Sequence, residues 1–161
     1  MKSLSLKQAF LLFQENRYKE ALELYPDYPM AHISSAELMR QEAFKNGWAW
    51  TKENIINHSF KSCPNSIDVY VTATDLAMRF EKYEEAIKYA EYALKHKPEN
   101  PVSLSQLINI MREMGIRSVD EVTKIHYFNQ ARKIAYHLRN VSTQHFKEAT
   151  DLIYAFNAQI P

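Results

Sequence analysis

Glycine and cysteine are nearly absent from this sequence. Its 161 residues include two glycines, Gly47 and Gly115, and one cysteine, Cys63. Because tight hairpin turns depend on glycine, this composition argues against a sheet protein rich in hairpins. One cysteine allows neither an internal disulfide nor a zinc site built from several cysteines, and it makes a reducing compartment the default. These absences favour an all-α fold.

Net charge and long apolar runs are lacking as well. Lys and Arg number 20 against 19 Asp and Glu, a formal charge of +1, so no overall field favours nucleic acid or an acidic membrane. No apolar run approaches the ~20 residues that span a bilayer. Lys7 and Gln8 interrupt the apolar start, which argues against a signal peptide. We expect a cytoplasmic protein that binds no nucleic acid and has no membrane span.

The clearest pattern present is the stretch from Tyr83 to Pro98. Its small and apolar residues recur at the i, i+3, i+4, i+7 spacing of an amphipathic helix, with acidic residues near its start and basic residues near its end. The segment from Ile67 to Phe80 has the same spacing, and only Glu81 and Lys82 separate the two. The sequence therefore predicts two antiparallel helices joined by a short turn.

Residues 67–100 resemble the tetratricopeptide repeat (TPR) family, whose unit is a helix pair of about 34 residues. The positions that match its signature are Tyr70, Ala73, Tyr83, Ala86, Ala93, Leu94 and Pro98. Two positions depart from it, because the family usually has Gly or Ala where Thr74 stands and an aromatic residue where Ala90 stands. The resemblance implies that similar helix pairs stack on either side of this one.

The periodicity holds over about residues 30–115, residues 2–30 follow it with a deletion, and the last 40 residues are assigned by analogy. Tyr18 and Ala21 repeat the pattern of Tyr83 and Ala86, and Pro64 stands 34 residues before Pro98. We expect one domain over residues 1–161, a right-handed α-solenoid of about four TPR-like helix pairs with a C-terminal capping helix. The expected repeats are 2–32, 33–66, 67–100 and 101–140, and the capping helix is 142–158.

The C-terminal part gives more detailed expectations. Gly115 is expected in the turn inside the fourth pair, and Ser118 to Glu121 has the pattern of a capping box before a helix of about 20 residues. Val122 is expected on the inward face of that helix. The final helix is expected to start at Ser142 or Thr143 and to place Phe146 inward.

Catalytic and metal-binding patterns are not evident. The six histidines show no ligand spacing with each other or with cysteine, and there is no glycine-rich phosphate loop. Carboxylates such as Asp68, Asp75, Glu37 and Glu113 are interpreted as polar groups on one face of the repeats. We therefore expect no enzyme activity, no cofactor and no metal.

The TPR resemblance implies a ligand groove on the concave side, formed by the first helix of each pair. Its side chains offer amide, carboxylate and guanidinium groups to a partner protein or peptide. The leading hypothesis is a non-enzymatic protein–protein interaction scaffold or adaptor; the alternative for these positions is ordinary solvated surface. The expected groove residues are Glu37, Gln41, Asp68, Val71, Asp75, Arg79, Ser105, Asn109 and Arg112.

The first helix supports a second hypothesis. Its apolar residues surround it almost completely, which a terminal helix would leave exposed. We expect homo-oligomer formation through Leu6, Phe10 and Phe13. This fits an oligomerisation or assembly module of a bacterial enzyme system, such as a surface-polysaccharide glycosyltransferase. A secretion-type chaperone is a further alternative, because TPR chaperones of that group have similar length.

Overall fold

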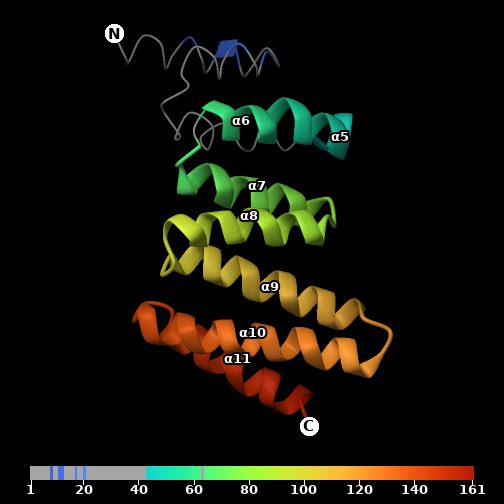
Figure 1. The fold of residues 1–161 in the computed structure, drawn as a ribbon, viewed down its shortest axis with the longest axis vertical. Helices are drawn as coiled ribbons and strands as arrows, with labels where there is room; N and C mark the ends of the chain where they lie inside the picture. The colour runs from blue at the N-terminus through green and yellow to red at the C-terminus, as the bar shows by residue number, and fades with distance from the viewer. Residues whose placement is uncertain (1–7, 9–10, 13–16, 18–19, 21–42, 63) are drawn as a thin grey trace. The chain divides into compact units, whose positions relative to one another are not determined.

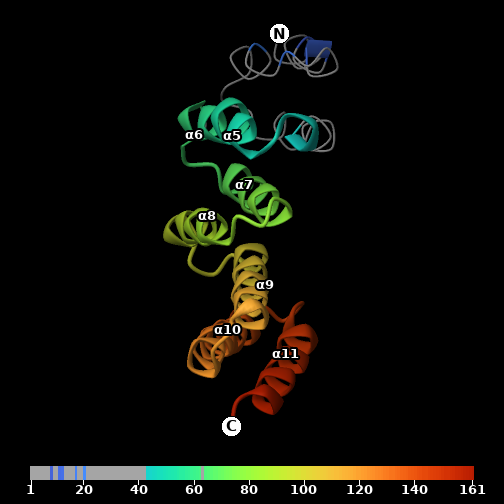
Figure 2. The same cartoon turned by 90° about the vertical axis from the view of Figure 1, so that its right-hand side faces the viewer.

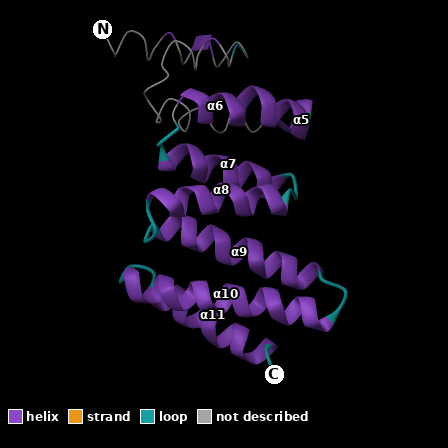
Figure 3. Ribbon diagram, viewed as in Figure 1, coloured by secondary structure: helices purple, strands orange, loops and turns teal. Residues whose placement is uncertain are grey.

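The computed structural model describes residues 8, 11–12, 17, 20, 43–62 and 64–161. Within these residues all regular structure is helical (Figure 3). This confirms the all-α class, while the right-handed solenoid stays a prediction. No helix in the described part of the chain has both the length and the apolar character needed to cross a membrane. The helices with both ends described are α5 (Trp48–Thr51), η1 (Lys52–Ile56), α6 (Asn57–Ser62), α7 (Ile67–Arg79), α8 (Tyr83–His96), α9 (Pro101–Arg117), α10 (Glu121–Val141) and α11 (Phe146–Gln159).

The contacts divide the chain into two compact units, Met1–Leu76 and Ala77–Pro161, so that the boundary falls inside α7. In the first unit, α5, η1 and α6 follow one another without a break. The turn after them is fixed by Tyr70, whose hydroxyl donates to the backbone oxygen of Pro64 at 2.5 Å. The hydroxyl of buried Thr74 donates to the backbone oxygen of Tyr70 at 2.8 Å, which satisfies a polar group where the TPR family usually has Gly or Ala.

The π-helical segment η1 was not predicted. A π-turn accommodates one extra residue, which weakens the regular backbone pairing nearby. Two side chains near its start donate to backbone oxygens one turn earlier. The Thr51 hydroxyl donates to the backbone oxygen of Gly47 at 2.8 Å, and the Asn54 amide donates to the backbone oxygen of Trp50 at 2.9 Å. Such back-bonding by short polar side chains distorts helices locally, and apolar spacing alone does not reveal it.

In the second unit each helix packs against the next, α8 against α9, α9 against α10 and α10 against α11 (Figures 1 and 2). The last three helices share one apolar core. Small residues of α10 let its neighbours approach closely, and the phenyl rings of Phe128 and Phe156 fill the space with centroids 6.0 Å apart. The buried core residues are Leu104, Ile108, Phe128, Ala131, Ala135, Leu138, Ala149, Ile153 and Phe156.

The turn between α7 and α8 ends α7 with the pair of hydrogen bonds of a Schellman motif. The N–H of Lys82 donates to the oxygen of Ala77 at 2.8 Å, and the N–H of Glu81 donates to Met78 at 3.0 Å. Glu81 has a φ of 57°, a left-handed conformation that glycine usually adopts. The short connection predicted from the sequence is therefore confirmed, but it has three residues, Phe80 to Lys82, where the apolar spacing predicted two, and its strained position holds an unexpected residue.

The prediction that Gly115 lies in a turn is wrong. Gly115 is inside α9, which continues to Arg117, and it is buried. A Cβ atom at this position would lie 2.7 Å from Cε1 of Phe128. The glycine is needed because α9 and the ring of Phe128 approach closely there, a tertiary reason that the local sequence does not show.

The predicted capping box is also wrong. The N-cap of α10 is Asp120, whose carboxylate accepts from the N–H of Thr123 at 2.8 Å. Ser118 instead ends α9, and its hydroxyl donates to the backbone oxygen of Met114 at 2.7 Å. Both residues are good caps, and they serve different helices. The 21-residue length of α10 agrees with the prediction of about 20.

Two further expectations about α10 and α11 are corrected. Val122 is 80% exposed, because it lies in the first turn of α10 beyond the reach of the core. The last helix begins at Phe146, after a turn in which the N–H of His145 donates to the oxygen of Ser142. Phe146 is 55% exposed at the start of that helix. The inward face of α11 is thus Ala149, Ile153 and Phe156.

Candidate functional site

The residues expected to line a groove are distributed over both units. Asp68, Val71 and Asp75 lie on the part of α7 that belongs to the first unit; Arg79, Ser105, Asn109 and Arg112 belong to the second. Each set is therefore a feature of its own unit. Five expected residues lie outside the described part of the chain: Glu37 and Gln41 of the groove, and Leu6, Phe10 and Phe13 of the self-association surface.

On α7, Asp68, Val71 and Asp75 follow one another at i, i+3 and i+7, so they share one side of the helix. Asp68 is exposed, and Val71 and Asp75 are half-buried. The backbone oxygen of Asp68 accepts from the hydroxyl of Thr72 at 2.9 Å. Arg79, in the second unit, is exposed at the end of the helix.

On α9, Ser105, Asn109 and Arg112 follow one another at i, i+4 and i+7 and share one side of the helix. Asn109 is exposed, and Ser105 and Arg112 are half-buried. None of the three side chains makes a hydrogen bond or ion pair with another residue that the structure describes. The oxygen of the Ser105 hydroxyl is itself covered, so it lacks a protein partner at a place that water reaches poorly. This side of α9 has polar groups that the fold does not use.

The start of α9 explains why these residues are held in position. Asn100 is its N-cap, and its side-chain oxygen accepts from the N–H groups of Val102 and Ser103 at 3.0 and 3.3 Å. Pro101 occupies the first helical position, where its fixed φ favours the helix. Leu104 and Ile108 of the same helix are buried in the core. The exposed side of α9 is therefore mounted on a rigid element.

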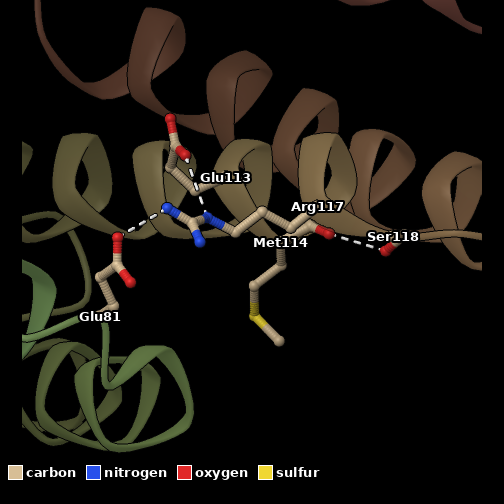
Figure 4. A network of polar contacts seen from close by, with 5 residues as sticks. All are labelled: Glu81, Glu113, Met114, Arg117 and Ser118. Atoms are coloured by element: carbon tan, nitrogen blue, oxygen red, sulfur yellow. Dashed lines mark hydrogen bonds and ion pairs between the residues drawn. The ribbon is translucent and has the colours of Figure 1, made fainter.

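The end of α9 carries a polar network around Arg117 (Figure 4). Its guanidinium Nη2 donates to Glu81 at 2.9 Å, and its Nε lies 3.7 Å from the carboxylate of Glu113. The guanidinium also lies 5.1 Å from the ring centroid of Tyr83, within cation–π range. The hydrogen bond with Glu81 raises the pKa of Arg117 above its ordinary value. Glu81 is thus paired despite its strained backbone.

Two apolar residues on the exposed side of α9 were missed by the sequence analysis. Val102 is 49% exposed and Ile116 is 57% exposed. They lie seven residues on either side of Asn109, and this spacing could have placed them on its side of the helix. They were missed because an apolar residue in an amphipathic helix is normally assigned to the core.

A different group has the largest pKa shift in the described chain. Tyr89 is buried on α8, and this burial raises the pKa of its hydroxyl to about 12, with the negative charge of Glu85 acting in the same direction. A phenol with so high a pKa stays protonated at neutral pH. Tyr89 is therefore a core residue with a polar end, and it was missed in the apolar stripe predicted for α8.

Arrangements with catalytic potential are sparse. The described residues include no group of three or more His, Cys, Asp or Glu side chains that could hold a metal ion. Ser142 and His145 form the arrangement most like a nucleophile and its base, with the hydroxyl oxygen 2.7 Å from Nδ1. No described carboxylate contacts the other ring nitrogen to orient it. The pair closes the α10–α11 turn.

The turn between α8 and α9 surrounds an open hollow of about 580 Å³. Its lining comes from six consecutive residues, His96 to Pro101, and its Asn100 side chain is already used as the cap of α9. Ligand sites usually combine polar groups from several elements around an apolar pocket. The exposed side of α9 is the better candidate.

Comparison with models of known protein families finds no match, and no curated protein matches this chain.

Proposed function

We propose that the chain is a non-enzymatic interaction scaffold or adaptor that binds a partner protein or peptide through the exposed side of α9. The observation that carries the proposal is the set of Ser105, Asn109 and Arg112, three polar side chains on one side of α9 without a partner among the described residues. The TPR resemblance of residues 67–100 supports it, because TPR proteins bind ligands through corresponding helices.

The chemistry of the three side chains suits a protein ligand. The amide of Asn109 both donates and accepts, so it can pair with a peptide group. Arg112 offers a planar fork that matches a carboxylate. Neither side chain makes a hydrogen bond or ion pair with another residue that the structure describes. Substitution of both should therefore reduce binding with little effect on stability.

The test is affinity capture from the native cell followed by a direct binding measurement with the purified partner. The bait proteins are the wild type, the double variant Asn109→Ala/Arg112→Ala, and a control with the same truncations on exposed residues of α8, Lys88→Ala/Glu91→Ala. The proposal expects a partner that binds the wild type and the control and is lost from the α9 variant, while all three proteins melt at the same temperature. A partner that binds all three equally, or no partner at all, contradicts it.

A further inference from the structure

The exposed side of α9 forms a straight line of five residues, Val102, Ser105, Asn109, Arg112 and Ile116, which we call the α9 strip. They follow one another at alternating steps of three and four residues. This alternation keeps side chains on one line along a helix, as at the contact positions of a coiled coil. With a rise of about 1.5 Å per residue, the strip is roughly 21 Å long from its first to its last residue.

The ends of the strip are apolar. Val102 is 49% exposed and Ile116 is 57% exposed, while the helix positions on the opposite side are buried in the core. Both side chains are branched at Cβ and therefore stiff, so contact with them costs little side-chain entropy. A ligand that follows the strip meets one apolar side chain at each end.

The centre of the strip is polar and carries one unmatched positive charge. Helix α9 has three charged residues, Arg112, Glu113 and Arg117. Glu113 lies 3.7 Å from Arg117, which also pairs with Glu81 (Figure 4), so both of these charges are matched. Arg112 has no ion pair among the described residues. A carboxylate in the ligand would complement it.

The spacing and the number of polar groups distinguish a helical ligand from an extended one. An extended chain covers roughly 21 Å with about six residues, and it brings a peptide N–H and C=O with each of them. The strip offers two accessible polar side chains, Asn109 and Arg112, to satisfy these groups, since the Ser105 hydroxyl is covered. A helix bonds its own backbone and presents side chains at the same alternating spacing.

We propose that the α9 strip binds an amphipathic helix of the partner, with apolar side chains about fourteen residues apart at its two ends and a carboxylate between them that pairs with Arg112. This inference rests on the proposed function and names the kind of partner. It assigns binding roles to Val102 and Ile116, and it gives Arg112 the selective contact.

The first test measures the spacing of the ligand. A photoreactive p-benzoylphenylalanine is placed at position 102 in one full-length protein and at position 116 in another, and each is crosslinked to the partner that affinity capture identifies. Mass spectrometry then locates the two crosslinked partner residues. A helix gives residues about fourteen apart in one segment, from the roughly 21 Å separation. Residues about six apart indicate an extended chain and overturn the proposal.

The second test measures the charge contact. Arg112→Glu should weaken binding about tenfold or more, and a partner with its central carboxylate residue changed to Lys should recover most of the loss. The control is Lys133→Glu, which makes the same charge change at an exposed residue of α10 and should leave the affinity unchanged. A loss that the partner's Lys does not restore contradicts the pairing.

The two proposals fail in different ways. If the α9 double variant keeps every partner of the wild type, the proposed function fails. If that variant loses its partner but the crosslinks indicate an extended chain, or the charge exchange gives no recovery, the binding function stands and the helical ligand is wrong.

Discussion

At Gly115 the backbone of α9 lies close to the edge of an aromatic ring. A Cβ atom there would be 2.7 Å from Cε1 and 2.8 Å from Cδ1 of Phe128, and this ring is 4% exposed. The ring belongs to one buried cluster with Phe156, whose ring centroid is 6.0 Å away, and with the alanines of α10 and α11. The absence of a single methyl group therefore sets the separation of two helices.

We expect Gly115→Ala to lower the free energy of unfolding by about 1 to 2 kcal/mol. Overpacking costs about 1 to 3 kcal/mol, and the better helix propensity of alanine offsets up to about 1 kcal/mol of it. Urea denaturation followed by circular dichroism measures the difference. In a Phe128→Leu background the clash is relieved, so the same substitution should become neutral or stabilising; an equal cost in both backgrounds contradicts the explanation.

Tyr89 gives a prediction about high pH. Its folded-state pKa of about 12 lies above the ordinary value of 10.0, so the unfolded chain loses this proton first. Burial of the protonated Tyr89 therefore contributes its full stabilisation below pH 10. This contribution to the free energy of unfolding is lost as the pH rises through 12, and the loss amounts to about 2 to 3 kcal/mol. Urea denaturation at pH 9 and pH 11.5 should show a smaller loss for Tyr89→Phe than for the wild type. Equal losses would place the pH dependence in other groups.

At the scale of whole helices, the α7–α8 turn combines a regular motif with an irregular residue. The Schellman hydrogen bonds require a left-handed residue at Glu81, where a side chain is strained. Its carboxylate accepts from Arg117 at the end of α9, which fixes the turn to a third helix. The pair is exposed on both sides, so its contribution to stability is small.

We expect Glu81→Gly to be more stable than Glu81→Ala by about 1 kcal/mol, because both remove the carboxylate and only glycine relieves the backbone. Thermal denaturation of the two variants measures this difference. The control is the same pair of substitutions, Lys88→Gly and Lys88→Ala, at an exposed residue in the middle of α8. There the order should reverse, with Gly less stable than Ala by a similar amount. The same order at both positions would contradict the left-handed assignment.

Helix positions were well predicted where the apolar spacing was regular. The stripe from Ile67 to Phe80, the stop at Pro98 and the start at Pro101 all correspond to the observed bounds of α7, α8 and α9. Helix ends were predicted less well. Ser118 and Asp120 are both good caps two residues apart, and only the packing of α9 on α10 decides which helix each one caps.

The candidate site was predictable only in part. The spacing of Ser105, Asn109 and Arg112 placed them on one side of a helix, as observed. The exposure of Val102 and Ile116 depends on where the neighbouring helices end, which a single sequence does not encode locally. Glu113, the acidic residue next to Arg112 in the sequence, faces a different side of the helix and lies 3.7 Å from Arg117 one turn further along.

At the scale of the whole molecule, the chain comprises two compact units, and the second has a core of its own formed by α9, α10 and α11. The sequence suggested a single repeat domain over residues 1–161, which stays a prediction. The last helix covers the apolar side of α10 with Ala149, Ile153 and Phe156 and leaves Lys147, Asp151 and Asn157 exposed.

Self-association is expected at the opposite end. The apolar residues Leu6, Phe10 and Phe13 predict that the chain forms oligomers through its first helix. Multi-angle light scattering should give a mass above that of one chain, and Phe10→Ser/Phe13→Ser should reduce it. The control Tyr154→Ser, at an exposed residue of α11, should leave the mass unchanged. A monomeric wild type at high concentration contradicts the prediction.

The contact between Gly115 and Phe128 also affects how fast the Phe128 ring can rotate. A phenyl ring turns half-way round its axis only when its surroundings briefly make room, and a closely packed interior rarely does. With the α9 backbone against one edge of the ring and Phe156 nearby, each half-turn of Phe128 needs a momentary separation of the helices. The rate at which this ring flips, read from its NMR line shapes, therefore records how often the core of the second unit opens.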